Sequence, residues 1–200
     1  MPFRRLRWLL LIWLFIWVPA YARTWGWANF LLLCDVAMFL TVLGVWRANA
    51  VLLSSQAVVT LFAAVVWMVD VSWKLIAGRH LYGGTEYMFD PVYPLWVRLL
   101  STFHLWLPLL LLWALRQTGY DSRGWIWQAT ISVPLVAVGR LFERAKNINF
   151  AFADPLFDRQ WGPGPLHVVI ISLSLIVFVY LPTHLLLKKF FRRAERASTP

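Results

Sequence analysis

Residues 51–73 read VLLSSQAVVTLFAAVVWMVDVSW, and Asp70 is the only ionisable side chain in this run. A helix needs about 20 predominantly apolar residues to cross the roughly 30 Å hydrocarbon core of a bilayer. The stretch therefore predicts a transmembrane helix. The rest of the chain can be divided in the same way, at the charged or Gly- and Pro-rich breaks between apolar runs.

Six apolar runs result from this division: Leu6 to Tyr21, Trp25 to Trp46, Val51 to Trp73, Leu95 to Leu115, Trp125 to Phe142 and Leu166 to Leu187. The breaks are short except for residues 78–94 and 143–165, which with six spans lie on the same side of the membrane. We find no linker or internal repeat. The sequence thus predicts an all-α fold in a single domain, 1–200: a polytopic integral membrane protein with a bundle of six transmembrane helices and two structured extracytoplasmic loops.

The composition agrees with a membrane protein. Hydrophobic residues make up 60% of the chain and charged residues 14%, with a mean hydropathy of +0.64, which leaves too little polar surface for a water-exposed globule. Many of the 14 Trp stand at the ends of apolar runs, as interface anchors do. Much of the net charge of +10 lies in terminal clusters flanking apolar segments, which favours membrane lipids as partners and argues against nucleic acid.

Basic residues predict the orientation. Six spans place 11 of them on the side of the termini, against only Asp121 and Glu195, whereas the other side is close to neutral. We therefore expect both termini in the cytoplasm of a multi-pass inner (plasma) membrane protein. The Ala20-Tyr21-Ala22 stretch also resembles a signal-peptide cleavage site, but the apolar run before it is long for a signal peptide and favours a retained first helix.

Ionisable groups within apolar runs are costly and call for a partner or a function. Cys34 lies nine residues in from Trp25, and His104 nine residues in from Leu95, the outer ends of their apolar runs. At 1.5 Å per residue each is about 14 Å deep, so a thiol and an imidazole could meet. A nearby base converts a thiol into a nucleophile, and Asp35 or Asp70 could orient that base. The predicted catalytic residues are Cys34, His104, Asp35 and Asp70. The alternative is that these residues are purely structural. Cys34 would then be an inert small hydrophobic residue, His104 would be hydrogen-bonded to a backbone carbonyl or a Ser/Thr side chain, and Asp70 would form an ion pair with Lys74 or Arg98.

The segment from Asn147 to His167 is too apolar for an aqueous loop and too rich in Pro and Gly for one helix, so we expect it to fold over the polar residues as a lid. We also expect Arg98 to face the bundle interior and to form a charged ring with Asp70 and Arg140. The predicted substrate-binding residues are Arg98, Arg140, Asn147, Asn149 and His167. The four histidines lack metal-binding spacing, and the single cysteine excludes CxxC motifs, so we predict no metal and no cofactor.

Several short motifs resemble those of a known family in order and spacing. Leu33-Cys34-Asp35, then Asp70, His104, Asn149-Phe150-Ala151-Phe152 and Gly162-Pro163-Gly164-Pro165 follow one another along the chain. This pattern resembles that of the YwaF-like integral membrane proteins, a six-span family related to the eukaryotic transmembrane acyltransferase of ether-phospholipid synthesis. The chain departs from the family at Leu32, where members often have a histidine.

The resemblance implies that Cys34 takes up an acyl group as a thioester while His104 serves as base. Together with the residues, it predicts a membrane protein that acts on lipid acyl chains by Cys-dependent transfer or hydrolysis in an outer-leaflet cavity. Two alternatives remain open at this point: a proton-linked small-molecule transporter that uses the same ionisable groups, and a scaffold without chemistry.

Overall fold

A computed structural model describes residues 3–198 of the chain, with side chains for residues 3–191. In this part of the chain helices are the only regular secondary structure and no strand forms, which confirms the all-α prediction. The helices are α1 (Arg4–Thr24), α2 (Leu33–Arg47), α3 (Ala50–Ala77), α4 (Leu95–Leu100), α5 (Phe103–Thr118), α6 (Gly124–Gly139), α7 (Gly164–Ser174) and α8 (Leu181–Ser198). The 3-10 turns are η1 (Trp27–Leu31), η2 (Glu86–Met88), η3 (Arg144–Lys146) and η4 (Ile148–Phe150), and a π-helical segment, η5 (Leu175–Tyr180), joins α7 to α8.

Four segments within the described residues are long and apolar enough to cross a membrane: Arg4–Thr24, Ala50–Ala77, Leu95–Thr118 and Gly164–Phe191. The chain is therefore a polytopic helical membrane protein. Helix α6 is apolar but has 16 residues, and α2 has 15, so they extend about 24 Å and 22 Å at 1.5 Å per residue. Both are shorter than a bilayer core, and six complete spans stay a prediction.

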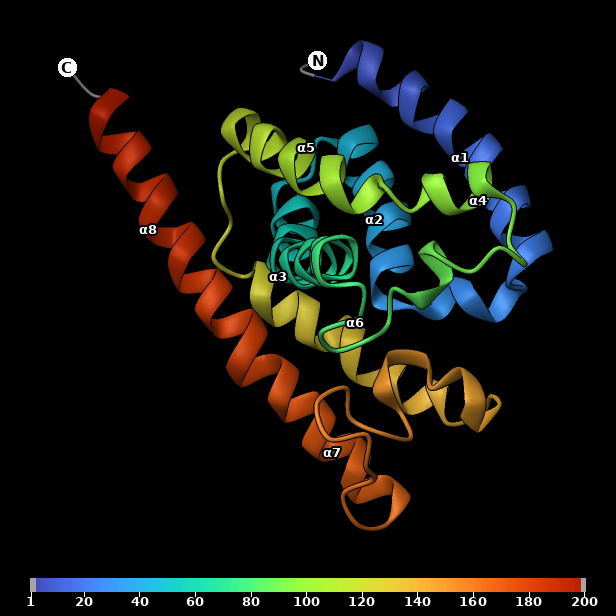
Figure 1. Cartoon of the computed structure of the whole chain (residues 1–200). Coiled ribbons are helices and arrows are strands. Elements are labelled where there is room, and N and C mark those ends of the chain that lie inside the picture. Colours follow the sequence, from blue (N-terminus) through green and yellow to red (C-terminus); the bar gives the residue numbers. More distant parts are fainter. Residues whose placement is uncertain (1–2, 199–200) are drawn as a thin grey trace.

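Helix α3 forms the centre of the molecule and packs most extensively against α2, α5 and α6. In Figure 1, α3 is seen nearly along its axis while α8 runs across the view, so the helices are steeply inclined to one another. The side chains of residues 53–60 are buried on every face of α3. Gly124 allows α6 to approach α3 closely, because an added Cβ would lie 2.7 Å from the Cβ of Ser54 in α3.

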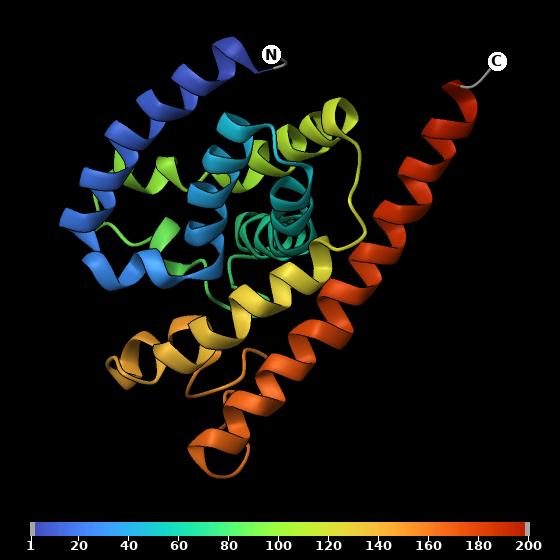
Figure 2. The same cartoon turned by 180° about the vertical axis from the view of Figure 1, so that it is seen from behind.

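The long helix formed by α7, η5 and α8 diverges from the other helices toward its C-terminal end, as both views show (Figures 1 and 2). Two hydroxyl contacts attach it to the bundle. The buried Tyr180 hydroxyl lies 2.6 Å from Ser132 Oγ, and the part-buried Tyr120 hydroxyl lies 2.8 Å from His184 Nδ1. The C-terminal cluster of basic residues extends into residues 192–200, whose side chains are not among those described.

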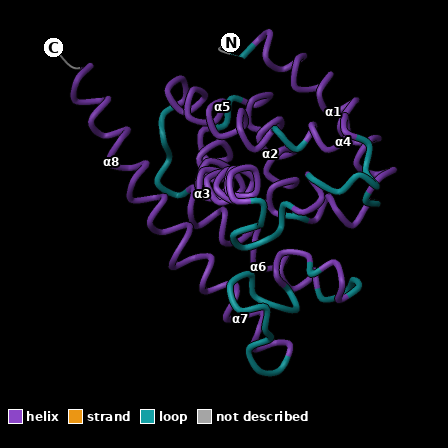
Figure 3. The backbone as a smooth tube through the Cα atoms, in the orientation of Figure 1, coloured by secondary structure: helices purple, strands orange, loops and turns teal. Residues whose placement is uncertain are grey.

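Two long connections, residues 78–94 and 140–163, hold most of the irregular backbone (Figure 3). The start of α1 and the end of α8 lie at the same end of the molecule, and the second connection lies at the opposite end in both views (Figures 1 and 2). The second connection packs closely against α6 at Gly139, where an added Cβ would lie 2.6 Å from the carbonyl oxygen of Ile148.

Candidate functional site

The candidate nucleophile lies at a break in the helical chain. The turn η1 ends at Leu31, Leu32 adopts an extended conformation (φ −60°, ψ 136°), and α2 begins at Leu33. Cys34 and Asp35 are therefore in the first turn of α2, which corrects the expectation that they lie in the middle of a continuous helix. A first-turn position places them beside backbone N–H groups that have no partner within the helix.

Asp35 is the immediate partner of the thiol. Cys34 Sγ lies 3.7 Å from Asp35 Oδ1, and Asn29 Nδ2 donates to Asp35 Oδ2 over 2.6 Å. Asp35 is only 1% exposed. No ion pair to Asp35 exists among the described residues, so an amide, a thiol and the start of α2 provide its polar surroundings.

His104 follows a second, weaker helix interruption, at Ser101 and Thr102 between α4 and α5. Its Nδ1 lies 2.8 Å from the carbonyl oxygen of Ser101. Because a carbonyl can only accept, Nδ1 carries the hydrogen and the neutral ring keeps its lone pair on Nε2. The ring stacks on Trp67, with ring centroids 5.1 Å apart and planes 5° apart. In the part of the chain that the structure describes, no carboxylate hydrogen-bonds to this ring.

Aromatic side chains connect His104 with the region of Cys34. Trp67 Nε1 donates to the Tyr87 hydroxyl over 2.9 Å, and the Tyr21 hydroxyl lies 2.5 Å from Ser101 Oγ. Burial raises the pKa of Tyr87, hydrogen bonds oppose this rise, and the proximity of Cys34 and Asp35 adds to it. Cys34 packs against the hydrophobic core that includes Tyr21 and Phe103, and the Phe103 ring stacks on His104 with ring centroids 4.1 Å apart. We call this set the Cys34–His104 cluster: Tyr21, Cys34, Asp35, Trp67, Tyr87, Ser101 and His104.

The aromatic members of the cluster cannot be predicted from the sequence. Tyr21 and Trp67 lie in apolar runs, where such residues normally read as interface anchors or core, and Tyr87 lies in a connection that gives no periodic signal. Cys34 and His104 belong to one cluster because both lie against the same hydrophobic core, which includes Phe103. However, no hydrogen bond joins the thiol to the imidazole within the described residues.

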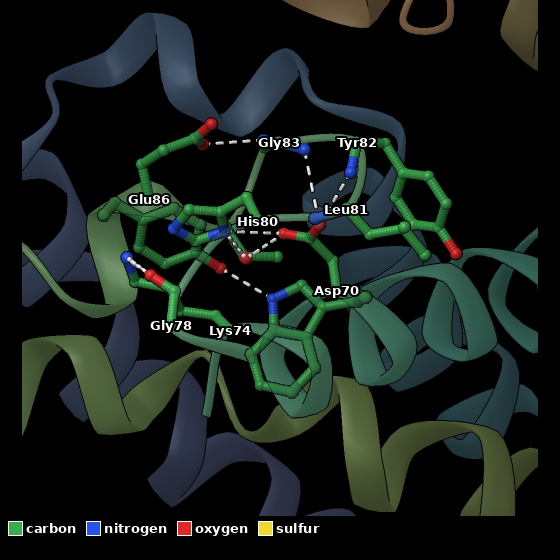
Figure 4. Close-up of polar contacts among 12 residues, drawn as sticks. Asp70, Lys74, Gly78, His80, Leu81, Tyr82, Gly83 and Glu86 are labelled. Atoms are coloured by element: carbon green, nitrogen blue, oxygen red, sulfur yellow. Dashed lines mark hydrogen bonds and ion pairs between the residues drawn. The ribbon is translucent and has the colours of Figure 1, made fainter. Parts of the chain in front are cut away.

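Asp70 anchors the connection after α3. Its Oδ1 accepts from the backbone N–H groups of Leu81 (2.7 Å), Tyr82 (2.9 Å) and Gly83 (3.3 Å). Its Oδ2 lies 2.9 Å from His80 Nδ1 and accepts a very short hydrogen bond from the Thr85 hydroxyl. Figure 4 shows the carboxylate enclosed by this loop. The structure thus places Asp70 in a loop anchor and not in contact with His104.

The expected partners of Asp70 bond elsewhere. Lys74 Nζ donates to the carbonyl oxygen of Gly78 over 2.8 Å, at the end of α3, so the predicted Asp70–Lys74 ion pair does not form. Arg98 is half-buried, and its Nη1 donates to the carbonyl oxygen of Met88 over 2.9 Å. The charged ring expected from Asp70, Arg98 and Arg140 is also wrong. Asp70 bonds to its own loop through His80, Thr85 and backbone N–H groups, and each arginine donates to a backbone carbonyl.

Arg140 and Asn147 hold the second connection in place. Arg140 Nη1 donates to the Ala151 carbonyl over 2.7 Å, and its guanidinium lies 4.5 Å from the ring centroid of Phe152. Asn147 Oδ1 accepts from the N–H groups of Phe152 (2.9 Å) and Ala153 (3.1 Å). Asn147 itself has φ 37°, a left-handed conformation that asparagine tolerates better than most residues.

His167 and Asn149 also bond to backbone. His167 Nδ1 accepts from the Trp161 N–H over 3.1 Å, and Nε2 therefore donates to the Phe150 carbonyl over 3.0 Å. Asn149 bonds to both sides of the break before α2. That these residues and the two arginines contact substrate stays a prediction; the contacts described here are with the protein's own backbone.

Asp154 organises the outer part of the same connection. It is 7% exposed and accepts from the N–H groups of Leu156 (3.0 Å) and Phe157 (2.8 Å) and from Trp161 Nε1 (2.9 Å). Burial by itself would raise the pKa of Asp154, but these donors outweigh it and hold the pKa below its ordinary value.

Within residues 3–191, no three His, Cys, Asp or Glu side chains lie together in a way that could hold a metal ion. Comparisons of the chain with protein-family models, curated proteins and solved structures found no match. The fold and the site define a polytopic helical membrane protein with a buried polar cluster that contains its only thiol.

Proposed function

We propose that this membrane protein is an enzyme that transfers or hydrolyses a lipid acyl group through a thioester on Cys34. The observation that carries the proposal is the position of the chain's single thiol, beside a buried carboxylate in the first turn of α2 and packed against the hydrophobic core whose Phe103 stacks on His104. The start of a helix favours negative charge that develops on sulfur. The Ser101 carbonyl leaves His104 Nε2 as the basic nitrogen.

The reaction has two halves. In the first, His104 Nε2 takes the proton of the Cys34 thiol, sulfur attacks the carbonyl carbon of a lipid ester, and a C–S bond replaces the ester C–O bond. The leaving alkoxide takes the proton from His104. In the second, a hydroxyl of an acceptor lipid, or water, loses its proton to His104 and attacks the thioester, which releases Cys34 as the thiol. Proton transfer between the two residues is assigned to the substrate-bound state, because catalytic hydrogen bonds often tighten only there.

The two carboxylates receive different roles in this proposal. Asp35 accepts from Cys34 and Asn29 and holds the thiol in the first turn of α2. Asp70 holds the connection that carries Tyr87, whose hydroxyl accepts from Trp67, the residue that stacks on His104. A proton relay through Asp70, as a transporter would use, is less well supported because five donors already surround its two oxygens.

The setting proposed for this chemistry is the one that the basic residues predict: an inner or plasma membrane, with both termini in the cytoplasm and the cluster in the outer half of the bilayer. Membrane lipids are the proposed substrates and partners. The motifs that resemble the YwaF-like family support the proposal, since Leu33 of the Leu33-Cys34-Asp35 motif bonds directly to Asn149 although more than 100 positions separate them.

Lipid profiles of cells that produce the wild-type chain or the Cys34→Ser variant test the function. The proposal expects a defined set of phospholipids to change in acyl composition with the wild type only, at equal protein levels. A matched control is Ser172→Ala, which alters a buried polar group of α7 outside the cluster. Identical profiles for wild type and Cys34→Ser would favour the scaffold.

A further inference from the structure

The break before α2 leaves two backbone groups that neither neighbouring element satisfies. The N–H of Leu33 is the first of α2 and has no acceptor within the helix. The carbonyl of Leu31 ends the turn η1. Leaving either group unpaired in a low-dielectric membrane protein is unfavourable, because no water is present there to bond to it. A break at this place therefore needs an outside partner with both a donor and an acceptor.

Asn149, 116 positions after Leu33, supplies both the donor and the acceptor. Its Oδ1 accepts from the Leu33 N–H over 2.8 Å, and its Nδ2 donates to the Leu31 carbonyl over 2.7 Å. The amide thus bridges Leu32 as a backbone strand would. Asn149 is 5% exposed and has φ 53°, so the chain keeps it in a conformation that few residues other than glycine adopt readily.

The backbone around Asn149 is fixed from two other helices. Arg140, at the end of α6, donates to the Ala151 carbonyl over 2.7 Å. His167, in α7, donates to the Phe150 carbonyl over 3.0 Å. Gly139 leaves room for the Ile148 carbonyl, which a Cβ would approach to 2.6 Å. Asn149 therefore transmits the position of α6 and α7 to the first turn of α2, one residue before Cys34.

We infer that Asn149 is a positioning residue for the reaction of Cys34: its amide sets the start of α2 and thereby the direction of the thiol. This inference rests on the proposed function. It replaces a substrate-binding role for Asn149, since the amide oxygen and the amide nitrogen each already bond to backbone.

The test uses the full-length protein in lipid nanodiscs. Asn149→Gly removes the amide and keeps a residue that adopts φ 53° freely, and Asn149→Asp keeps an oxygen for the Leu33 N–H but cannot donate to Leu31. Asn49→Gly is the matched control, because Asn49 caps α3 through the Leu52 N–H (2.9 Å) in the same way, at a helix start that carries no cluster residue. Two readouts are compared: acylation of Cys34 by p-nitrophenyl octanoate, and hydrogen exchange of residues 29–36.

Asn149→Gly is expected to lower the maximal acylation rate at least tenfold, at an unchanged probe concentration for half-maximal rate, and to accelerate exchange in residues 29–36 at least tenfold. Asn149→Asp is expected to fall between it and the wild type, and Asn49→Gly to match the wild type in both readouts. Wild-type acylation and exchange in Asn149→Gly overturn the inference. If that variant does not accumulate, wild-type values for Asn149→Asp overturn it.

The two proposals fail in different ways. If the wild-type chain forms no thioester with the probe, the proposed chemistry fails, and the exchange data alone decide whether Asn149 sets the start of α2. If the wild type is acylated and Asn149→Gly is acylated equally fast, the proposed function stands and the positioning role fails.

Discussion

His104 Nδ1 lies 2.8 Å from the carbonyl oxygen of Ser101, three residues earlier in the chain. This contact is possible because the helix loosens into 3-10 geometry at Ser101 and Thr102: the Leu105 N–H bonds to Thr102 instead of Ser101 over 2.9 Å. The backbone thus selects one tautomer of a buried histidine without help from a carboxylate. The ring nitrogen that remains basic is Nε2.

The first prediction separates the two ring nitrogens. In His104→Asn the amide N–H₂ takes the place of Nδ1 and can still donate to Ser101, but the basic Nε2 is lost. Acyl turnover should fall about 100- to 10,000-fold, the usual contribution of a general base, with a melting temperature near that of the wild type. His184→Asn, at a buried histidine bound to Tyr120, is the control. Full activity in His104→Asn would remove the base from the mechanism.

A second prediction concerns the loop anchor. Asp70→Asn replaces an acceptor oxygen with a donor that faces Thr85 and His80, so it should lower the free energy of unfolding by about 3 kcal/mol and speed tryptic cleavage at Arg79. Lys74→Ala should change the free energy of unfolding by less than about 0.5 kcal/mol, because Lys74 bonds only to an exposed carbonyl. Equal losses in the two variants would instead indicate an Asp70–Lys74 ion pair.

A third prediction is the pH dependence of the second connection. The pKa of Asp154 is lowered in the fold, so its stabilising contribution is complete above its unfolded pKa of about 3.9 and is lost as the pH falls through the lower folded value. Hydrogen-exchange protection of residues 154–161, corrected for intrinsic rates, should be constant from pH 8 to 5 and decline below about pH 4. In Asp154→Asn, protection should already be reduced at pH 7. Loss of protection between pH 7 and 6 would contradict the assignment to this carboxylate.

The sequence predicts the helical segments well, because each apolar run is long enough to show where water is excluded. The six predicted runs correspond to α1, η1 with α2, α3, α4 with α5, α6, and α7 to α8. It does not predict the break at Leu32, since Leu31, Leu32 and Leu33 are identical in hydropathy. That break is stabilised by Asn149, a contact across 116 positions that no local pattern encodes.

For the candidate site, the sequence indicates which residues are costly but not how each is satisfied. It places Cys34, Asp35 and His104 in one region, and in the structure Cys34 packs against the hydrophobic core whose Phe103 stacks on His104. It predicts Lys74 or Arg98 as the charged partner of Asp70, whereas backbone N–H groups, His80 and Thr85 of a tight loop take that role. Such loops form by local turn geometry, which charge counting does not capture.

The most direct test of the account is mass spectrometry of Cys34 after the purified chain is incubated with p-nitrophenyl octanoate in nanodiscs. The account predicts an octanoyl thioester on Cys34 that hydroxylamine removes, formed at least 100-fold more slowly in His104→Asn and absent in Cys34→Ala. An unmodified Cys34 in the wild type, or equal labelling of the wild type and His104→Asn, would contradict it.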